Sequence, residues 1–257
     1  MHVFLSAFWL PKAGNSKNEY EDAFYPEKGG ERRGNMLRFA VADGASEALL
    51  SGEWARILVR AFCREAETDS CFLGRSTRSW DKWKGTYLSV RQRQGRPIQW
   101  FEEPGLQAGA FSTLLGLVLM DSEEESHGRW TAVAVGDSCV FQVRGEALIG
   151  KFPMDHSTQF DIQPFLLSSG PAGNRRFPEV LRRSQGDWHR DDRFYLMTDA
   201  LACWFLRTYE AGDNPWAIPR DLDTRDAPLS FTEWMGELRG KKQLRNDDIT
   251  LIRIDIM

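Results

Sequence analysis

Acidic residues at the ends of apolar, strand-like segments are the residues of this chain best placed to do chemistry. Four such places occur along the sequence, at Glu21-Asp22, Asp43, Asp199 and Asp247-Asp248. Hard divalent cations prefer carboxylate oxygens, and strand ends give such ligands rigid supports while leaving positions open for water. The pattern therefore predicts a metal site built from several carboxylates. Each Asp taken alone has another explanation, because Asp is also common in turns and at helix N-termini.

The segments that must position these acids alternate between strand-like and helical patterns. Continuous or alternating apolar runs predict strands at 4–10, 37–43, 111–120, 129–138, 139–145, 193–199 and 249–256. Apolar residues at helical spacing predict helices at 47–66, 76–101, 200–210 and 230–240. Gly95 and Pro97 weaken the end of the second helix, and the composition of residues 153–192 predicts mainly loop with short elements.

The connections between the strands indicate how these elements pack. Hairpin-type connections favour antiparallel pairing, and the numbers of strands and helices favour helices outside two facing sheets over a parallel βαβ fold. No repeat or linker divides residues 1–257, so we expect a single domain.

Composition excludes several classes of function. With 42% hydrophobic residues among 257 and a net charge of -4, the chain should form a sizeable core and offers no electrostatic basis for binding nucleic acid. No apolar run approaches the roughly 20 residues that span a bilayer, and the first residues lack a signal-peptide pattern, so we expect a cytoplasmic protein that does not bind membranes. The four cysteines and four histidines show no zinc-binding spacing.

Six short blocks of the sequence, in the same order, resemble the PPM-type (protein phosphatase 2C-like) metal-dependent phosphatases, in a form similar to bacterial members. These blocks are KNEYEDAF, FAVADGAS, GAFSTLLGLVL, VGDSCVFQV, LMTDAL and NDDITLIRI. The resemblance implies an α+β fold of four layers, an α-β-β-α sandwich in which two facing antiparallel sheets are flanked by helices. It also implies hydrolysis of phosphoserine and phosphothreonine in phosphoproteins by a metal-activated water.

The resemblance also implies the roles of individual residues. Two divalent cations, Mn²⁺ or Mg²⁺, are expected, with Asp43 bridging them and Gly44 contributing its backbone carbonyl. Asp137 takes the acidic position of the Gly-Asp-Ser hairpin, where the family can bind a third cation. Lys17 stands where most members have an Arg that grips the phosphate. The implied metal ligands are Glu21, Asp22, Asp43, Gly44, Asp137, Asp199 and Asp247, and the implied catalytic residues are Asp22, Asp43 and Lys17.

Four positions depart from the family pattern. Lys17 supplies a point charge in place of a bidentate guanidinium, and it can also be explained as a solvated surface charge. Ala45 stands where many eukaryotic members have a His, so the leaving group must be protonated by water or another acid. Cys203 replaces an acid that helps to bind a third cation, and Asp248 replaces an Asn.

These departures leave an alternative function open. The chain could be a weak or inactive family member that binds phosphoproteins without hydrolysing them, or a regulatory subunit without metal. For the enzyme, we expect a monomer whose partners are a phosphorylated protein substrate and a serine/threonine kinase that acts in opposition. Substrate specificity would lie in the loops 66–105 and 153–192, and their sequences contain no motif that identifies a substrate.

Overall fold

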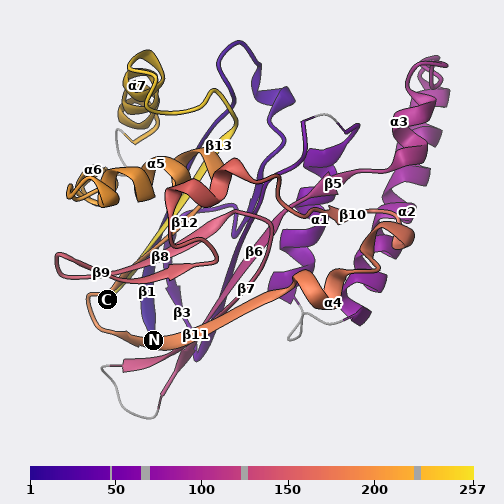
Figure 1. Cartoon of the computed structure of the whole chain (residues 1–257). Coiled ribbons are helices and arrows are strands. Elements are labelled where there is room, and N and C mark those ends of the chain that lie inside the picture. The colour runs from indigo at the N-terminus through magenta and orange to yellow at the C-terminus, as the bar shows by residue number, and fades with distance from the viewer. Residues whose placement is uncertain (47, 65–69, 123–126, 223–226) are drawn as a thin grey trace.

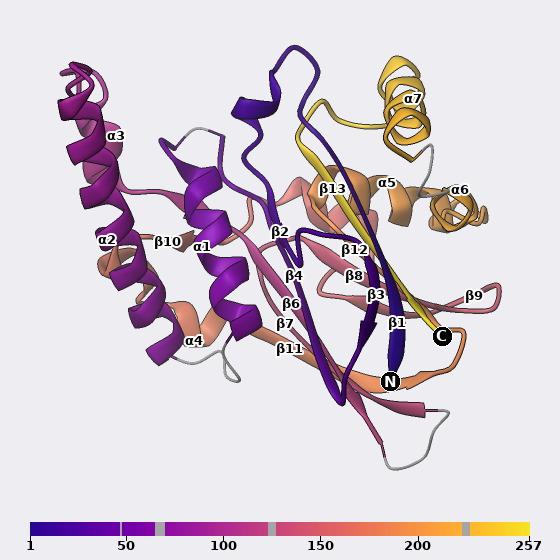
Figure 2. The same ribbon diagram turned by 180° about the vertical axis from the view of Figure 1, so that it is seen from behind.

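The chain forms four layers in the order helix, sheet, sheet, helix, as the computed structural model shows (Figure 1). The structure describes residues 1–46, 48–64, 70–122, 127–222 and 227–257. Two antiparallel sheets face each other, and one group of helices covers the outer side of each sheet (Figure 2). The predicted α-β-β-α sandwich is therefore confirmed.

The first sheet has six strands in the order β3-β1-β13-β12-β8-β9. The strands are β1 (His2–Leu10), β3 (Gly30–Arg33), β8 (Cys139–Arg144), β9 (Ala147–Phe152), β12 (Arg193–Met197) and β13 (Ile249–Ile256). β13 lies in the middle, where Ile256 faces Val3 of β1 and Leu251 faces Met197 of β12. Both of its faces are buried, so its polar side chains Thr250 and Arg253 are buried along with its isoleucines.

The second sheet has five strands in the order β11-β7-β6-β4-β2. The strands are β2 (Ala23–Tyr25), β4 (Met36–Ala42), β6 (Leu114–Asp121), β7 (His127–Val135) and β11 (Arg182–His189), and a separate short pair joins β5 (Phe111–Ser112) to β10 (Leu167–Ser168). β4 is a central strand paired with β2 and β6, so its end that leads to Asp43 is held between two neighbours.

The helices divide between the two outer layers. The second sheet is covered by α1 (Ser51–Arg64), α2 (Ser70–Arg93), α3 (Glu103–Ala108) and α4 (Phe177–Val180), and the first by α5 (Asp199–Glu210), α6 (Ala217–Asp221) and α7 (Ala227–Gly240). Short 3₁₀ helices lie at Lys17–Glu19, Ser157–Asp161 and Pro171–Asn174. None of the described helices has the length and apolar character needed to cross a bilayer.

Three apolar clusters fill the spaces between the four layers. The middle cluster joins the inner faces of both sheets, with Leu117 of β6 and Ile252 of β13 fully buried. The second packs α5 and α7 on the first sheet, and the third packs α1 and α2 on the other sheet through side chains such as Trp54. Each sheet is therefore buried on both faces, which fixes the strand ends that carry the acids.

Some elements differ from the sequence predictions. The helix predicted at 76–101 is α2, which begins at Ser70 and ends at Arg93, and α3 follows separately. Gly95 has a φ of +70° just after α2, a conformation that ends a helix readily at glycine. The helix predicted at 47–66 begins only at Ser51, with its position 47 and its last two positions outside the described residues. Residues 153–192 contain a full strand, β11, in place of loop alone.

Candidate metal centre

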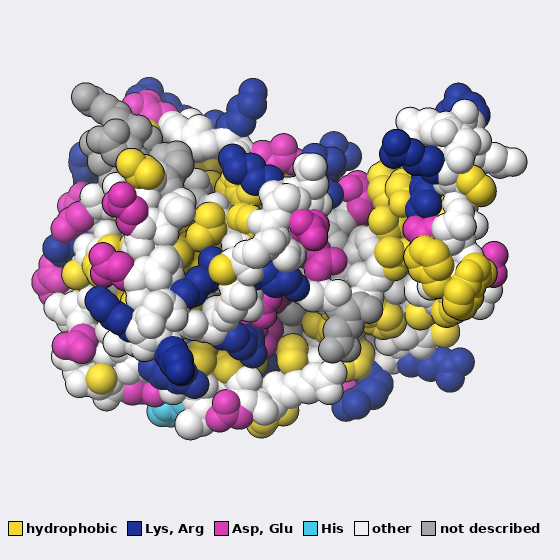
Figure 3. Space-filling model, turned by 90° about the horizontal axis from the view of Figure 1, so that it is seen from above, with side chains coloured by type: hydrophobic (Ala, Val, Ile, Leu, Met, Phe, Trp, Pro, Cys, Tyr) yellow, Lys and Arg dark blue, Asp and Glu magenta, His cyan; other side chains and the backbone are white. Residues whose placement is uncertain are grey.

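The predicted acids gather at one end of the sandwich, from separate segments of the chain. Asp43 follows β4, Asp137 lies in the turn between β7 and β8, Asp199 begins α5, and Asp247 lies just before β13. These four side chains line a cleft of about 420 Å³ together with Gly44 and other residues. Figure 3 looks down on this end of the molecule, where acidic and basic side chains lie close together near the middle of the face.

Asp22 lies below this cleft, almost fully buried. One of its oxygens, Oδ2, accepts hydrogen bonds from Thr250 Oγ1 at 2.7 Å and Thr198 Oγ1 at 3.0 Å. The other oxygen, Oδ1, is buried without a hydrogen-bond partner among the described residues. Thr250 Oγ1 also lies 2.5 Å from the hydroxyl of Tyr20. The two threonines therefore fix the Asp22 carboxyl and leave one oxygen available to a cation.

The electrostatics of the cluster disfavour ionised acids that have no cation beside them. Burial, and next the repulsion from Asp22 and Asp137, raise the pKa of Asp43. Burial likewise raises the pKa of Asp22 and of Glu21, and it raises the pKa of Asp137 to about 6. Buried carboxylates that repel one another in this way are stabilised by divalent cations.

The turn that carries Asp43 is held rigidly by the neighbouring strand segment. The backbone N–H of Asp43 donates to Thr113 Oγ1 at 2.9 Å, and its carbonyl accepts from Thr113 N and Ser112 Oγ, both at 2.8 Å. Thr113 Oγ1 in turn lies 2.9 Å from Ser138 Oγ, next to Asp137. These hydroxyls explain why the Gly-x-x-Ser/Thr and Gly-Asp-Ser blocks accompany the acids.

Gly44 is needed for close packing of the chain at this site. A Cβ at Gly44 would lie 2.6 Å from the carbonyl oxygen of Glu21 and 2.8 Å from the carbonyl carbon of Ser51. Both atoms belong to the backbone, so they could move only with the segments that carry the acids. The predicted role of its carbonyl as a metal ligand is not tested by this contact.

Asp248 has a structural role that the sequence did not predict. Its carboxylate accepts the backbone N–H groups of Lys12 at 2.8 Å and Glu21 at 2.6 Å. It therefore fastens the segment with Glu21 and Asp22 to the start of β13. A pattern of acids does not distinguish a carboxylate that binds backbone N–H groups from one that faces a cleft.

Arg245 is the second residue that sequence reasoning missed. Its guanidinium pairs with Asp199 Oδ2 through Nη2, and its Nε lies 3.6 Å from Asp247 Oδ2. Its charge also opposes the rise in the pKa of Asp137. The sequence held a signal, since an Arg two residues before the expected metal ligand Asp247 places a positive charge close to that ligand.

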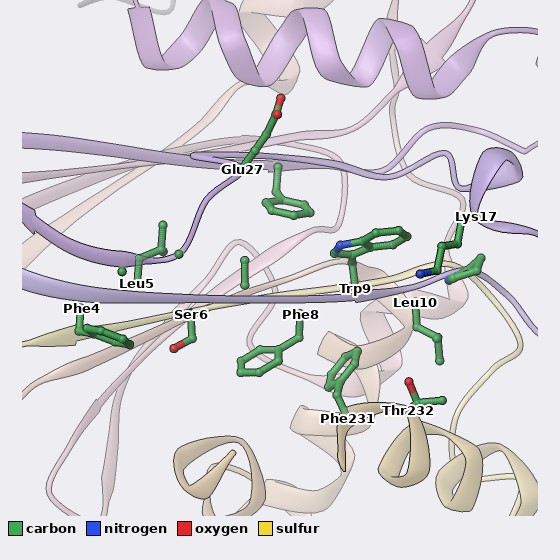
Figure 4. Close-up of a pocket in the computed structure, with 15 residues that line it drawn as sticks. Phe4, Leu5, Ser6, Phe8, Trp9, Leu10, Lys17, Glu27, Phe231 and Thr232 are labelled. Carbon is green, nitrogen blue, oxygen red and sulfur yellow. The ribbon is translucent and has the colours of Figure 1, made fainter. Parts of the chain in front are cut away.

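Lys17 does not line this cleft. It lies in a different, largely apolar pocket of about 610 Å³ along β1, where its ammonium stands 5.9 Å from the centre of the Trp9 ring (Figure 4). Phe8 and Phe231 form another part of that pocket, away from any of the predicted acids. Cys203 lies in α5, half-buried, with its thiol 3.9 Å from the carbonyl of Ser157.

The donor set fits hard divalent cations by its chemistry. The buried Oδ1 atoms of Asp22 and Asp137 lack partners within the described ranges, and divalent cations bound beside them would supply the missing partners. As placed, however, no three or more His, Cys, Asp or Glu side chains of the described residues close around one metal position. Arg245 supplies a reason, because its guanidinium takes up the space between Asp199 and Asp247.

Comparison with known proteins identifies relatives of the same fold. The family model described as protein phosphatase 2C matches residues 15–246. A Mycobacterium tuberculosis serine/threonine phosphatase, PstP/Ppp, is 16% identical to this chain and superposes with a TM-score of 0.55. The match covers 100% of this chain and 99% of the PstP/Ppp chain. The PstP catalytic domain in complex with 2 manganese ions is also similar, with 16% identity, a TM-score of 0.51 and coverage of 98% of both chains. RsbX in complex with magnesium has 16% identity and a TM-score of 0.52, and the match covers 100% of this chain and 96% of RsbX. No curated protein matches this sequence.

Proposed function

Because this chain belongs to the protein phosphatase 2C family, we propose that it hydrolyses phosphoserine and phosphothreonine in phosphoproteins, with two divalent cations, Mn²⁺ or Mg²⁺, as cofactor. The observation that carries this proposal is the convergence of acids from five segments on one end of the sandwich, where buried oxygens of Asp22 and Asp137 have no hydrogen-bond partner among the described residues. The PstP and RsbX structures contain manganese and magnesium respectively, which supports the choice of metals.

We assign the cations to the carboxylates of the cleft and its floor. Asp43, Asp22, Asp199 and Asp247 would hold them, together with Glu21 and the carbonyl of Gly44, and Asp137 would serve a further cation. Bound divalent cations supply a more acidic water as nucleophile and offset the charge of the phosphoryl oxygens. The chain contributes the positions of these acids, which Thr198, Thr250 and Asp248 fix through hydrogen bonds.

The substrate phosphate and the leaving group depend on fewer residues of this chain. Ala45 lines the cleft and cannot donate a proton, so a water or another acid must protonate the leaving alkoxide. Lys17 remains our proposed phosphate-binding residue from the sequence, and in that role its ammonium would have to leave the ring of Trp9. We also propose that the protein works as a single-domain monomer in the cytoplasm, opposite a serine/threonine kinase.

The pairing of Arg245 with Asp199 favours one alternative, a family member that binds phosphoproteins without turnover. An assay separates the two functions. Purified wild-type protein should release phosphate from a phosphothreonine peptide with Mn²⁺, and a chelator or Asp43→Asn should stop the reaction. Asp213→Asn is the matched control, because this Asp is exposed and lies outside the cleft. Tight peptide binding with no release of phosphate would establish the binding function, and release that persists in Asp43→Asn would refute the proposed site.

A further inference from the structure

Arg245 is the one Lys or Arg among the described residues that line the acidic cleft. Its side chain is 57% exposed, whereas its partner Asp199 is 9% exposed. The Arg therefore reaches down from the rim of the cleft to a buried carboxylate. An arginine guanidinium carries its positive charge at every pH at which the protein is folded.

The oxygens that Arg245 contacts are those that a cation would need. In Asp199, Oδ1 accepts the backbone N–H of Ala200 at 2.5 Å, and Oδ2 faces Arg245. In Asp247, Oδ1 accepts the backbone N–H of Asp248 at 3.0 Å, and Oδ2 faces Arg245. Each carboxylate thus has one oxygen occupied by the backbone, and its second oxygen is directed at the same guanidinium.

Asp22, on the other side of the site, has no ion-pair partner among the described residues, and its Oδ1 is buried without a hydrogen-bond partner there. The site is therefore asymmetric, with an unpartnered oxygen at Asp22 and a guanidinium that contacts Asp199 and Asp247. A cation that binds the Asp199 side must displace the Arg, whereas a cation on the Asp22 side need not.

The backbone keeps Arg245 beside these acids. The N–H of Asp247 donates to the carbonyl of Arg245 at 3.1 Å, and Arg239 Nη2 donates to the carbonyl of Asp247 at 2.6 Å. These bonds fix the turn that leads into β13. The effective concentration of the guanidinium at Asp199 is therefore high, as for any tethered ligand.

We propose that Arg245 is a tethered counter-ion that competes with a divalent cation for Asp199 and Asp247, so that one of the two cations binds more weakly than the other. This inference rests on the proposed metal site and adds an order of loading to it. The cation on the Asp22 and Asp43 side binds first. The second cation binds only at concentrations that displace Arg245.

Calorimetric titration of the metal-free protein with Mn²⁺ tests this inference without measuring activity. Arg245→Gln should tighten the weaker site by up to about fivefold, the range expected for removing a partly exposed ion pair, and leave the tighter site nearly unchanged. Arg245→Lys keeps a positive charge near the acids, so the Mn²⁺ affinity of its weaker site should lie between those of wild type and Arg245→Gln. Arg176→Gln is the matched control for loss of one positive charge, since Arg176 pairs with Glu179 on an exposed surface outside the cleft.

A double-mutant cycle with Asp199→Asn shows whether the effect acts through the observed pair. In that background Arg245→Gln should tighten binding much less, because only the longer contact of Arg245 with Asp247 remains. Circular dichroism shows whether each variant is folded. If the double variant does not fold, the comparison of Arg245→Gln with wild type still tests the inference.

The possible results decide the inference and the proposed function separately. Mn²⁺ binding by Arg245→Gln that is tighter than in wild type, or that appears only in this variant, supports the inference. Equal affinities in wild type and Arg245→Gln overturn the inference alone and leave the proposed phosphatase in place. No Mn²⁺ binding in either protein overturns the inference together with the proposed metal site.

Discussion

Removing the hydroxyl of Thr250 should destabilise the protein by an amount that can be calculated from its two hydrogen bonds. Thr250 is fully buried in β13, and its Oγ1 contacts both Asp22 Oδ2 and the hydroxyl of Tyr20. Thr250→Val keeps the shape of the side chain and removes only the hydroxyl. Its backbone N–H, which donates to Thr198 Oγ1 at 3.0 Å, is retained.

The magnitude follows from the two lost hydrogen bonds. A bond to an ionised carboxylate contributes about 1.5–3 kcal/mol, and leaving the buried Tyr20 hydroxyl unpaired adds about 1 kcal/mol. With Mn²⁺ bound and Asp22 ionised, we expect the free energy of unfolding to fall by about 3 kcal/mol, which lowers Tm by about 6–12 °C for a chain of this size. In chelator, burial keeps Asp22 protonated at neutral pH, and a bond to the neutral acid contributes about 1 kcal/mol less.

Thermal melts of Thr250→Val in Mn²⁺ and in chelator measure this difference. Thr86→Val is the matched control, because the Thr86 hydroxyl bonds the Lys82 carbonyl at 3.1 Å on the exposed face of α2, and its loss should change stability by no more than about 0.5 kcal/mol. The reasoning fails if Thr250→Val is as stable as Thr86→Val in both buffers. It also fails if the loss is the same with and without metal.

Three further predictions concern the same end of the molecule. In chelator, the free energy of unfolding should fall as the pH rises from about 4 through about 6. The ordinary pKa of Asp is about 4 and burial raises the pKa of Asp137 to about 6, so in this window the folded chain keeps protons that the unfolded chain releases. Thermal melts between pH 4 and 8 in which stability rises across this window would contradict the prediction. Asp248→Asn leaves one of the N–H groups of Lys12 and Glu21 without an acceptor and should cost about 1–3 kcal/mol in denaturant unfolding, so an unchanged midpoint would count against the role of Asp248. Gly44→Ala places a Cβ against the backbone of Glu21, so it should lower the free energy of unfolding by about 1–3 kcal/mol and weaken Mn²⁺ binding. Calorimetry that finds wild-type Mn²⁺ affinity in this variant would show that the close packing at Gly44 is not needed.

The sequence predicted the layers well because burial leaves a direct trace in it. β6, for example, has both faces covered, and its sequence LLGLVLM appears as a continuous apolar run. β11 escaped prediction because it is an edge strand with mostly exposed side chains, so its sequence RRSQGDWH has no apolar alternation. β2 and β3 are too short for a periodic pattern to be visible.

The sequence predicted which acids lie together at one end of the sandwich, and it missed the contacts that support them. Asp43 could be placed because it directly follows the buried strand β4, and Asp199 because it begins α5 just after β12. The roles of Asp248 and Arg245 depend on contacts with Lys12, Glu21 and Asp199, which are distant in sequence and become neighbours only in the fold. Lys17 matches a family position by spacing alone, and spacing does not determine that its side chain turns toward Trp9.

The number of cations bound per chain tests the central claim most directly. Equilibrium dialysis against saturating Mn²⁺ at pH 7.5, followed by metal analysis, should find at least two ions per chain for wild type and for Asp213→Asn. Asp43→Asn, which removes the carboxylate proposed to bridge them, should bind fewer. A wild-type chain that binds no Mn²⁺, or an Asp43→Asn chain that binds as many ions as wild type, would contradict the account.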